Sequence, residues 1–175
     1  AIGYDALTAN TTGANSVAVG YESLMTNTTG GGNTATGYRA LTLNTTASGN
    51  TAYGDGALLA TTTGASNTAI GRFTLSTNTT GRNNTALGYY ALGYNTTGEH
   101  NVGIGADSLT SNTTGQHNIG IGTEALEGTT TGNSNIGIGY RAGYGNTTAH
   151  YSVAIGREAL FGANTQNGQT AVGYK

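Results

Sequence analysis

Residues 67–83 read N-T-A-I-G-R-F-T-L-S-T-N-T-T-G-R-N, and residues 84–100 repeat the phrase as N-T-A-L-G-Y-Y-A-L-G-Y-N-T-T-G-E-H. The phrase continues outward in both directions with no insertion or deletion. A short fixed period is typical of proteins built from stacked structural units that contact only their neighbours. We therefore expect residues 1–175 to form a single repeat array. One glycine, here called the period glycine, recurs every 17 residues, as Gly3, Gly20, Gly37, Gly54, Gly71, Gly88, Gly105, Gly122, Gly139, Gly156 and Gly173.

The three residues before each period glycine favour a short β-strand. The first is β-branched in all ten copies, the third is mostly β-branched, and Ala or Gly lies between them. This alternation predicts a strand whose branched side chains point into the coil, while small residues such as Ala18, Ala69 and Gly103 face outward. Leucine stands four residues after the period glycine in nine copies and is expected to pack inside.

The N-T-T-G segment predicts a turn, for which its glycine supplies positive φ. Adjacent threonines on an extended chain face opposite sides, so we expect one row at the surface. The second threonine is present in every copy and is a candidate surface-binding ladder, formed by Thr12, Thr29, Thr46, Thr63, Thr80, Thr97, Thr114, Thr131, Thr148 and Thr165. N-T-T is also a glycosylation sequon, unless its asparagine serves only the turn. The candidate glycosylation sites are Asn10, Asn27, Asn44, Asn78, Asn95, Asn112 and Asn146.

These features together predict an all-β protein, a parallel β-solenoid or β-roll of about ten 17-residue coils. Parallel strands lie about 4.8 Å apart, so like residues would stack into Asn and Thr ladders along the rod. Three apolar side chains per coil make a thin core, which favours a further buried surface. We expect a homo-oligomer, either a trimer or an end-to-end filament, formed through the outward small residues and the tyrosines. The matching fragments at residues 1–4 and 171–174 favour a segment of a longer array, or a stacking subunit.

The phrases N-S-V-A-V-G (residues 15–20), N-T-A-I-G (67–71) and Y-S-V-A-I-G (151–156) resemble the head repeats of trimeric autotransporter adhesins. The longer N-T-T-G-containing phrase is similar to repeats in phage tail-fibre and bacterial surface proteins. The resemblance implies a left-handed parallel β-roll, three chains side by side, and an extracellular, cell-surface or virion-fibre location. It departs from the adhesin heads in one respect, because the coil here is longer by the N-T-T-G segment.

Composition and motifs offer little chemistry. Charged residues make up 8%, the net charge is −2, and cysteine is absent, so the chain has no electrostatic footprint for nucleic acid and no thiolate site. No stretch is apolar enough for membrane insertion. His100 and His117 occupy equivalent positions in neighbouring coils. They are interpreted either as a metal-binding pair or as exposed turn residues. We predict no enzyme activity, no cofactor and no metal site.

Charged residues two positions after the period glycine should form an edge with ion pairs between coils. The expected pairs are Glu22–Arg39 and the series Glu124–Arg141–Glu158–Lys175. Asp107 lies beside Glu124 as a like-charged neighbour.

Three functions fit this pattern. The first is a structural or adhesive surface-fibre segment that presents a repetitive face to a cell, a host surface or a matrix ligand. The second is a self-assembling extracellular filament with a mechanical role. The third is an ice-binding or crystal-surface-binding solenoid, which would use the regular threonine row.

Overall fold

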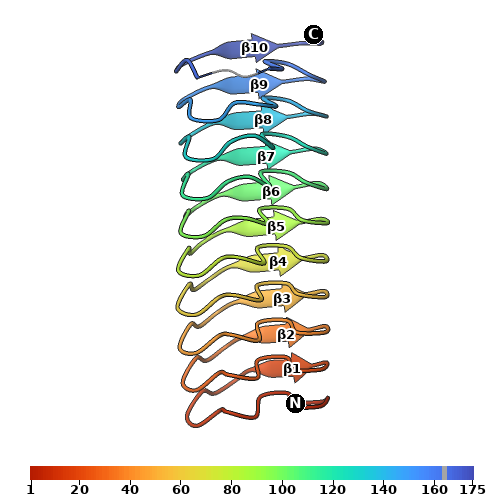
Figure 1. Cartoon of the computed structure of the whole chain (residues 1–175), viewed down its shortest axis with the longest axis vertical. Helices are drawn as coiled ribbons and strands as arrows, with labels where there is room; N and C mark the ends of the chain where they lie inside the picture. The colour runs from red at the N-terminus through yellow and green to blue at the C-terminus, as the bar shows by residue number, and fades with distance from the viewer. Residues whose placement is uncertain (163–164) are drawn as a thin grey trace.

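The chain winds into a rod of stacked coils, each of which contributes one short strand (Figure 1). The computed structural model describes residues 1–162 and 165–175, and within these ranges it contains no helix. All ten strands lie in one parallel sheet in chain order. The predicted parallel solenoid with a 17-residue coil is therefore confirmed. The strands are β1 (Val17–Val19), β2 (Thr34–Thr36), β3 (Thr51–Tyr53), β4 (Thr68–Ile70), β5 (Thr85–Leu87), β6 (Val102–Ile104), β7 (Ile119–Ile121), β8 (Ile136–Ile138), β9 (Val153–Ile155) and β10 (Thr170–Val172).

Neighbouring coils are joined in a constant register. Val17 pairs with Thr34 and Thr51 pairs with Thr68, so that equivalent residues lie directly above one another. Backbone hydrogen bonds between coils continue outside the strands, as from the Leu24 N–H to the Ala40 carbonyl at 3.0 Å. Because the next coil supplies these partners, a coil satisfies its backbone with only three residues of regular strand.

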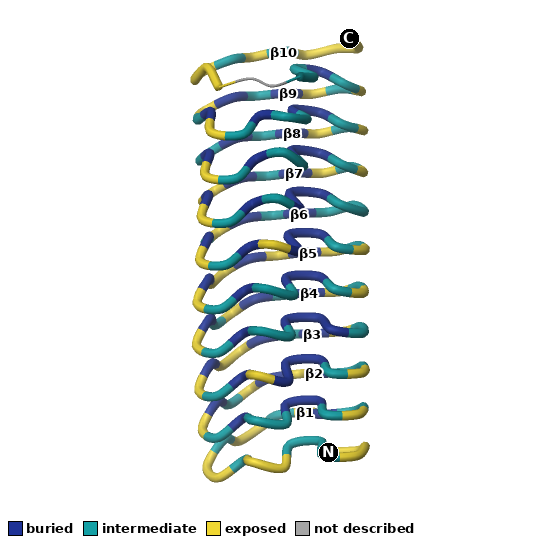
Figure 2. The backbone as a smooth tube through the Cα atoms, viewed as in Figure 1, coloured by how far each residue is buried: buried dark blue, intermediate teal, exposed yellow. Residues whose placement is uncertain are grey.

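The strands face the opposite way from the sequence prediction. Ala18 and Ala69 are buried, at 1% and 0% exposure, whereas Val17 is 50% exposed and Ile70 is 39% exposed (Figure 2). The small residues point inward because leucine side chains fill the space opposite them. A β-carbon added to Gly103 would lie only 3.2 Å from the Leu92 Cγ atom. The interior therefore admits Ala or Gly, and the branched side chains are left outside.

The second strip of small residues, three positions after the period glycine, is also internal. Ser23, Ala40 and Ala91 are all 0% exposed, so the predicted outward strip of small residues is wrong. These side chains are enclosed because each directly precedes a buried leucine of the leucine row. Neither row of small residues is available to a partner.

The leucine row is buried, as predicted, and it has an unusual backbone. Leu92 has φ of 52° and is 0% exposed. The left-handed conformation costs a residue other than glycine about 1–2 kcal/mol. Here it is held by bonds to the next coil, such as that from the Leu92 N–H to the Ser108 carbonyl at 2.9 Å. Gly143, where the row lacks leucine, adopts φ of 67° without this cost.

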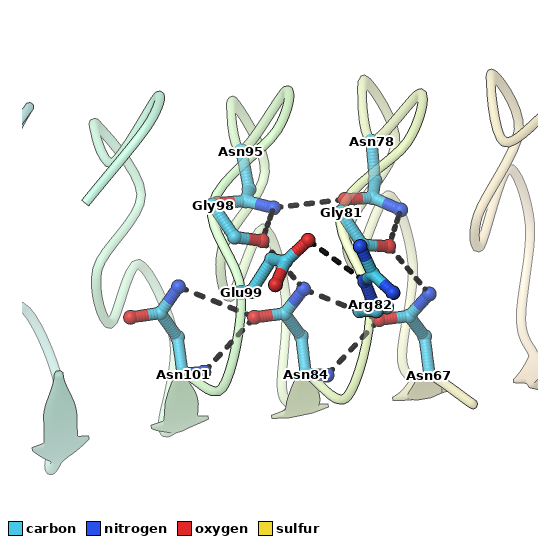
Figure 3. A network of polar contacts seen from close by, with 9 residues as sticks. All are labelled: Asn67, Asn78, Gly81, Arg82, Asn84, Asn95, Gly98, Glu99 and Asn101. Carbon is cyan, nitrogen blue, oxygen red and sulfur yellow. Dashed lines mark hydrogen bonds and ion pairs between the residues drawn. The ribbon is translucent and has the colours of Figure 1, made fainter. Parts of the chain in front are cut away.

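Two ladders of buried asparagines complete the interior (Figure 3). One ladder is formed by the asparagines of N-T-T, where the Asn95 Nδ2 group donates to the Asn78 Oδ1 atom at 2.8 Å. The other lies four residues before the period glycine, where the Asn84 backbone N–H donates to the Asn67 Oδ1 atom at 3.0 Å. The Gly81 carbonyl accepts from both Asn67 and Asn78, at 2.9 and 3.0 Å, and so joins the ladders.

The glycine after N-T-T does not have the predicted role. The backbone of Gly81 does not adopt positive φ. A β-carbon at Gly81 would lie 2.4 Å from both the Gly98 carbonyl oxygen and the Asn78 Oδ1 atom. Glycine is favoured there because the ladder and the next coil approach its backbone closely.

Candidate functional site: the exposed faces of the rod

The outer face of the sheet is regular and free of charge. Its side chains are the first and third residues of each strand, and none of these is charged. Between β2 and β5 the first residue is always threonine. Between β6 and β9 every outward residue is valine or isoleucine, and we call this group the apolar patch. The apolar patch consists of Val102, Ile104, Ile119, Ile121, Ile136, Ile138, Val153 and Ile155.

The face extends over all ten strands of the sheet. Ten strands about 4.8 Å apart and three residues wide span about 500 Å². Ile121, Ile138 and Ile155 are 36%, 37% and 38% exposed, so these three side chains present a substantial part of their surface to solvent. Contiguous exposed apolar surfaces often mark interaction sites, and the apolar patch is a surface of this type.

The threonine ladder lies at the surface along the whole rod. All ten residues of the candidate surface-binding ladder, from Thr12 to Thr165, are exposed. The first threonine of N-T-T is turned toward the next coil instead, as where the Thr28 Oγ1 group donates to the Thr45 carbonyl at 2.9 Å. The two adjacent rows thus face different ways, as expected, and the second row is the outward one.

A charged edge follows the residues two positions after the period glycine. The Arg39 Nε atom lies 3.2 Å from the Glu22 Oε2 atom, and the Arg141 Nε atom lies 2.6 Å from the Glu124 Oε2 atom. These two predicted pairs are confirmed. The predicted continuation of the series to Glu158 is wrong, because the Glu158 carboxylate lies 3.8 Å from Arg157 instead. Burial and the nearby Glu124 carboxylate raise the pKa of Asp107 above its ordinary value. The hydrogen bond to Glu124 raises the pKa of Arg141.

Aromatic rings also stack along the rod because the register repeats. The rings of Tyr4, Tyr21 and Tyr38 are stacked at 5.3 and 5.2 Å. The His100 and His117 rings lie 5.0 Å apart and almost parallel, as predicted for equivalent positions in neighbouring coils. Outside residues 163–164, no three His, Cys, Asp or Glu side chains lie close enough to hold a metal ion.

The candidate glycosylation sites are placed inside the rod. Asn27, Asn44, Asn78, Asn95 and Asn112 are fully buried. Their Nδ2 groups donate within the ladder, as from Asn112 to Asn95 at 2.7 Å. Asn146 is 2% exposed and Asn10 is partly buried. A glycan on a fully buried ladder amide does not fit this packing, which favours a structural role for the buried asparagines over glycosylation.

Two shallow hollows lie on the surface of the terminal coils. One is bounded by Asp5, Thr8 and Thr26, and another by Leu160, Phe161 and Lys175. Neither involves a residue of the threonine ladder. Across residues 1–162 and 165–175, no helix has the length and apolar character needed to cross a membrane.

No family model, curated protein or solved structure matches this chain.

Proposed function

We propose that this chain is a structural or adhesive segment of an extracellular surface fibre. The observation that carries the proposal is the uninterrupted outer sheet, which presents the same uncharged side-chain positions from β1 to β10. Many weak contacts along such a face give avidity without a deep pocket. The resemblance of its phrases to adhesin heads and tail-fibre repeats supports the same function.

Copies of the chain would associate through the sheet face. A second copy carries the same strand spacing of about 4.8 Å, so its side-chain rows match those of the first along the full length. The apolar patch supplies the burial that favours such contact. The face alone, about 500 Å², falls short of the roughly 800 Å² per partner of a standard stable interface. We therefore propose an assembly in which each chain makes further contacts, as in a trimer or filament.

Native mass and particle shape test this assembly together. The variant Ile121→Lys/Ile138→Lys places two charges in the apolar patch. The matched control, Thr114→Lys/Thr131→Lys, places them on the exposed threonine ladder. We expect a defined oligomer and rod-shaped particles for the parent chain and the control, with monomers for the patch variant. A monomeric parent chain, or equal masses for the two variants, would contradict association through the sheet.

Adhesion itself is tested by displaying the parent chain on polystyrene beads. Retention of these beads on epithelial cells and on matrix-coated surfaces, above that of albumin-coated beads, supports the adhesive role. Rod-shaped oligomers without any retention would restrict the proposal to a mechanical filament.

A second candidate function, binding to ice or another crystalline surface, is favoured by the exposure of all ten ladder threonines. The hydroxyl rows would match a regular lattice. Thermal hysteresis at millimolar protein, lost in a Thr63→Lys/Thr97→Lys variant, is the expected result. Absence of hysteresis and of ice shaping would remove this candidate.

A further inference from the structure

The ladder formed by the N-T-T asparagines is interrupted at two places. Asn27 donates to Asn10 at 2.9 Å and Asn44 donates to Asn27 at 2.7 Å. The next coil has Thr61 at the ladder position, and four coils later Thr129 takes the same place. A threonine hydroxyl can both donate and accept, but neither threonine hydroxyl forms a hydrogen bond here, so the ladder is interrupted at both positions.

Each interruption leaves the same two oxygen atoms without partners. At the first break these are the Asn44 Oδ1 and Thr61 Oγ1 atoms, and at the second the Asn112 Oδ1 and Thr129 Oγ1 atoms. All four residues are 0% exposed. Buried polar atoms in folded proteins are nearly always hydrogen-bonded, to protein groups or to ordered water. The same two unpaired atoms recur at two separate coils, so a packing defect confined to one coil does not explain them.

The breaks differ from the intact coils in the atoms that lie beside the glycine after N-T-T. In an intact coil the Oδ1 atom of the ladder asparagine lies beside the following glycine, as Asn78 Oδ1 would be 2.4 Å from a β-carbon at Gly81. At Gly64 the three atoms nearest to such a carbon, out to 3.1 Å, include none from Thr61. Threonine has one heavy atom fewer than asparagine and a shorter reach, so its hydroxyl does not take the place of that amide oxygen.

We propose that each break is an internal binding site for one water molecule. At the first break the water donates to the Asn44 Oδ1 atom and shares a hydrogen bond with the Thr61 hydroxyl. The Asn78 Nδ2 group, which donates to Gly81 on one side, faces the break from the next coil. These groups give the two to four polar partners that buried waters require. The second site uses Asn112 and Thr129 in the same way. This inference is independent of the proposed function.

The substitution Thr61→Val distinguishes a hydrated site from a dry one. If water bridges the hydroxyl, valine removes one of its partners, and we expect a lower urea midpoint. If the site is dry, valine removes an unsatisfied hydroxyl and the midpoint stays the same or rises, which would overturn the proposal. Thr63→Val, at an exposed position of the same coil, is the matched control and should leave the midpoint unchanged.

The substitution Thr61→Asn completes the ladder and displaces the water. We expect a higher midpoint and loss of density for water at this break in a high-resolution crystal structure, with the water beside Thr129 retained. The parent structure should show one ordered water at each break. Absence of water at both breaks in the parent structure would overturn the proposal even if the valine variant failed to fold.

Discussion

The carbonyl oxygen of Gly105 lies 2.7 Å from the position that a β-carbon on Gly88 would occupy. The obstacle is the backbone of the next coil, which cannot move without disturbing its own register. Gly88 also has φ of 127°. We therefore expect Gly88→Ala to cost more than about 4 kcal/mol, measured as the loss of free energy of unfolding in urea.

Gly173 provides the control for this experiment. Its φ is 130°, but no atom lies within 4 Å of an added β-carbon. Gly173→Ala should therefore carry only the backbone strain, about 1–3 kcal/mol. Equal losses at the two positions would show that the period glycine is required for conformation alone and not for the close approach of the coils.

The inward orientation of the middle strand residue is tested by Ala69→Val. Ala69 is fully buried, and two added methyl groups would overpack the interior at a cost of about 1–3 kcal/mol. The neighbouring change Thr68→Val, on the outer side of the same strand, should alter the free energy of unfolding by less than about 0.5 kcal/mol. The reverse ranking in thermal or urea unfolding would contradict the orientation of β4.

The asparagine ladder four residues before the period glycine should be sensitive to truncation. The Asn84 Oδ1 atom accepts from the Asn101 backbone N–H at 2.9 Å, and its Nδ2 group donates to the Gly98 carbonyl at 2.9 Å. Asn84→Ala leaves the buried Asn101 N–H unpaired. The Gly98 carbonyl loses one of its two hydrogen bonds and keeps the one from the Asn95 Nδ2 group at 3.0 Å. The change should cost about 1–3 kcal/mol.

Urea unfolding measures this cost, and hydrogen exchange at the Asn101 N–H locates it. The matched change Thr97→Ala, at the exposed ladder, should stay within about 0.5 kcal/mol of the parent. Unchanged protection of the Asn101 amide would argue against the ladder.

Asp107 should make the folded state less stable as pH rises. Its pKa is raised by burial and by Glu124, so the folded state favours the protonated acid. The contribution of Asp107 to the free energy of unfolding is fully present below the pKa that this carboxyl has in the unfolded state. It is lost as pH rises through the higher pKa of the folded state. Asp107→Asn should therefore increase the free energy of unfolding at about pH 7 relative to its effect at about pH 3. Urea midpoints at the two pH values measure this, and a pH-independent difference would exclude the charge as the cause.

The sequence was sufficient to predict the period, the position of each strand and the burial of the leucine row. It predicted the register because equal spacing of like residues leaves one natural way to stack the coils. The contacts Glu22–Arg39 and His100–His117 follow directly from that register. These features depend on the spacing of like residues, which can be read directly from the sequence.

The orientation of the strands was not predictable from alternation alone. A three-residue strand places either its middle residue or its two outer residues inside, and hydrophobicity favoured the wrong choice. The deciding quantity is the width of the interior, which Leu92 fills opposite Gly103. Tyr53 and the outer threonines of β2 to β5 were a signal that the first and third strand residues face outward, because large or polar side chains do not fit a narrow apolar interior.

The second asparagine ladder was also missed. Asn67 and Asn84 belong to a row of seven asparagines four residues before the period glycine. The recurrence was visible, but an asparagine before a strand is equally typical of a turn. Only the structure places the row inside, where its side chains accept backbone hydrogen bonds from the coil that follows.

The uneven distribution of side chains on the outer sheet gives the rod a direction. All ten strands run the same way, with threonine concentrated between β2 and β5 and the apolar patch between β6 and β9. Two rods packed side by side in parallel would bring their apolar patches together. Two rods packed side by side in antiparallel orientation would set each apolar patch against threonines. A bundle of such rods would therefore be polar, with every member pointing toward the same end.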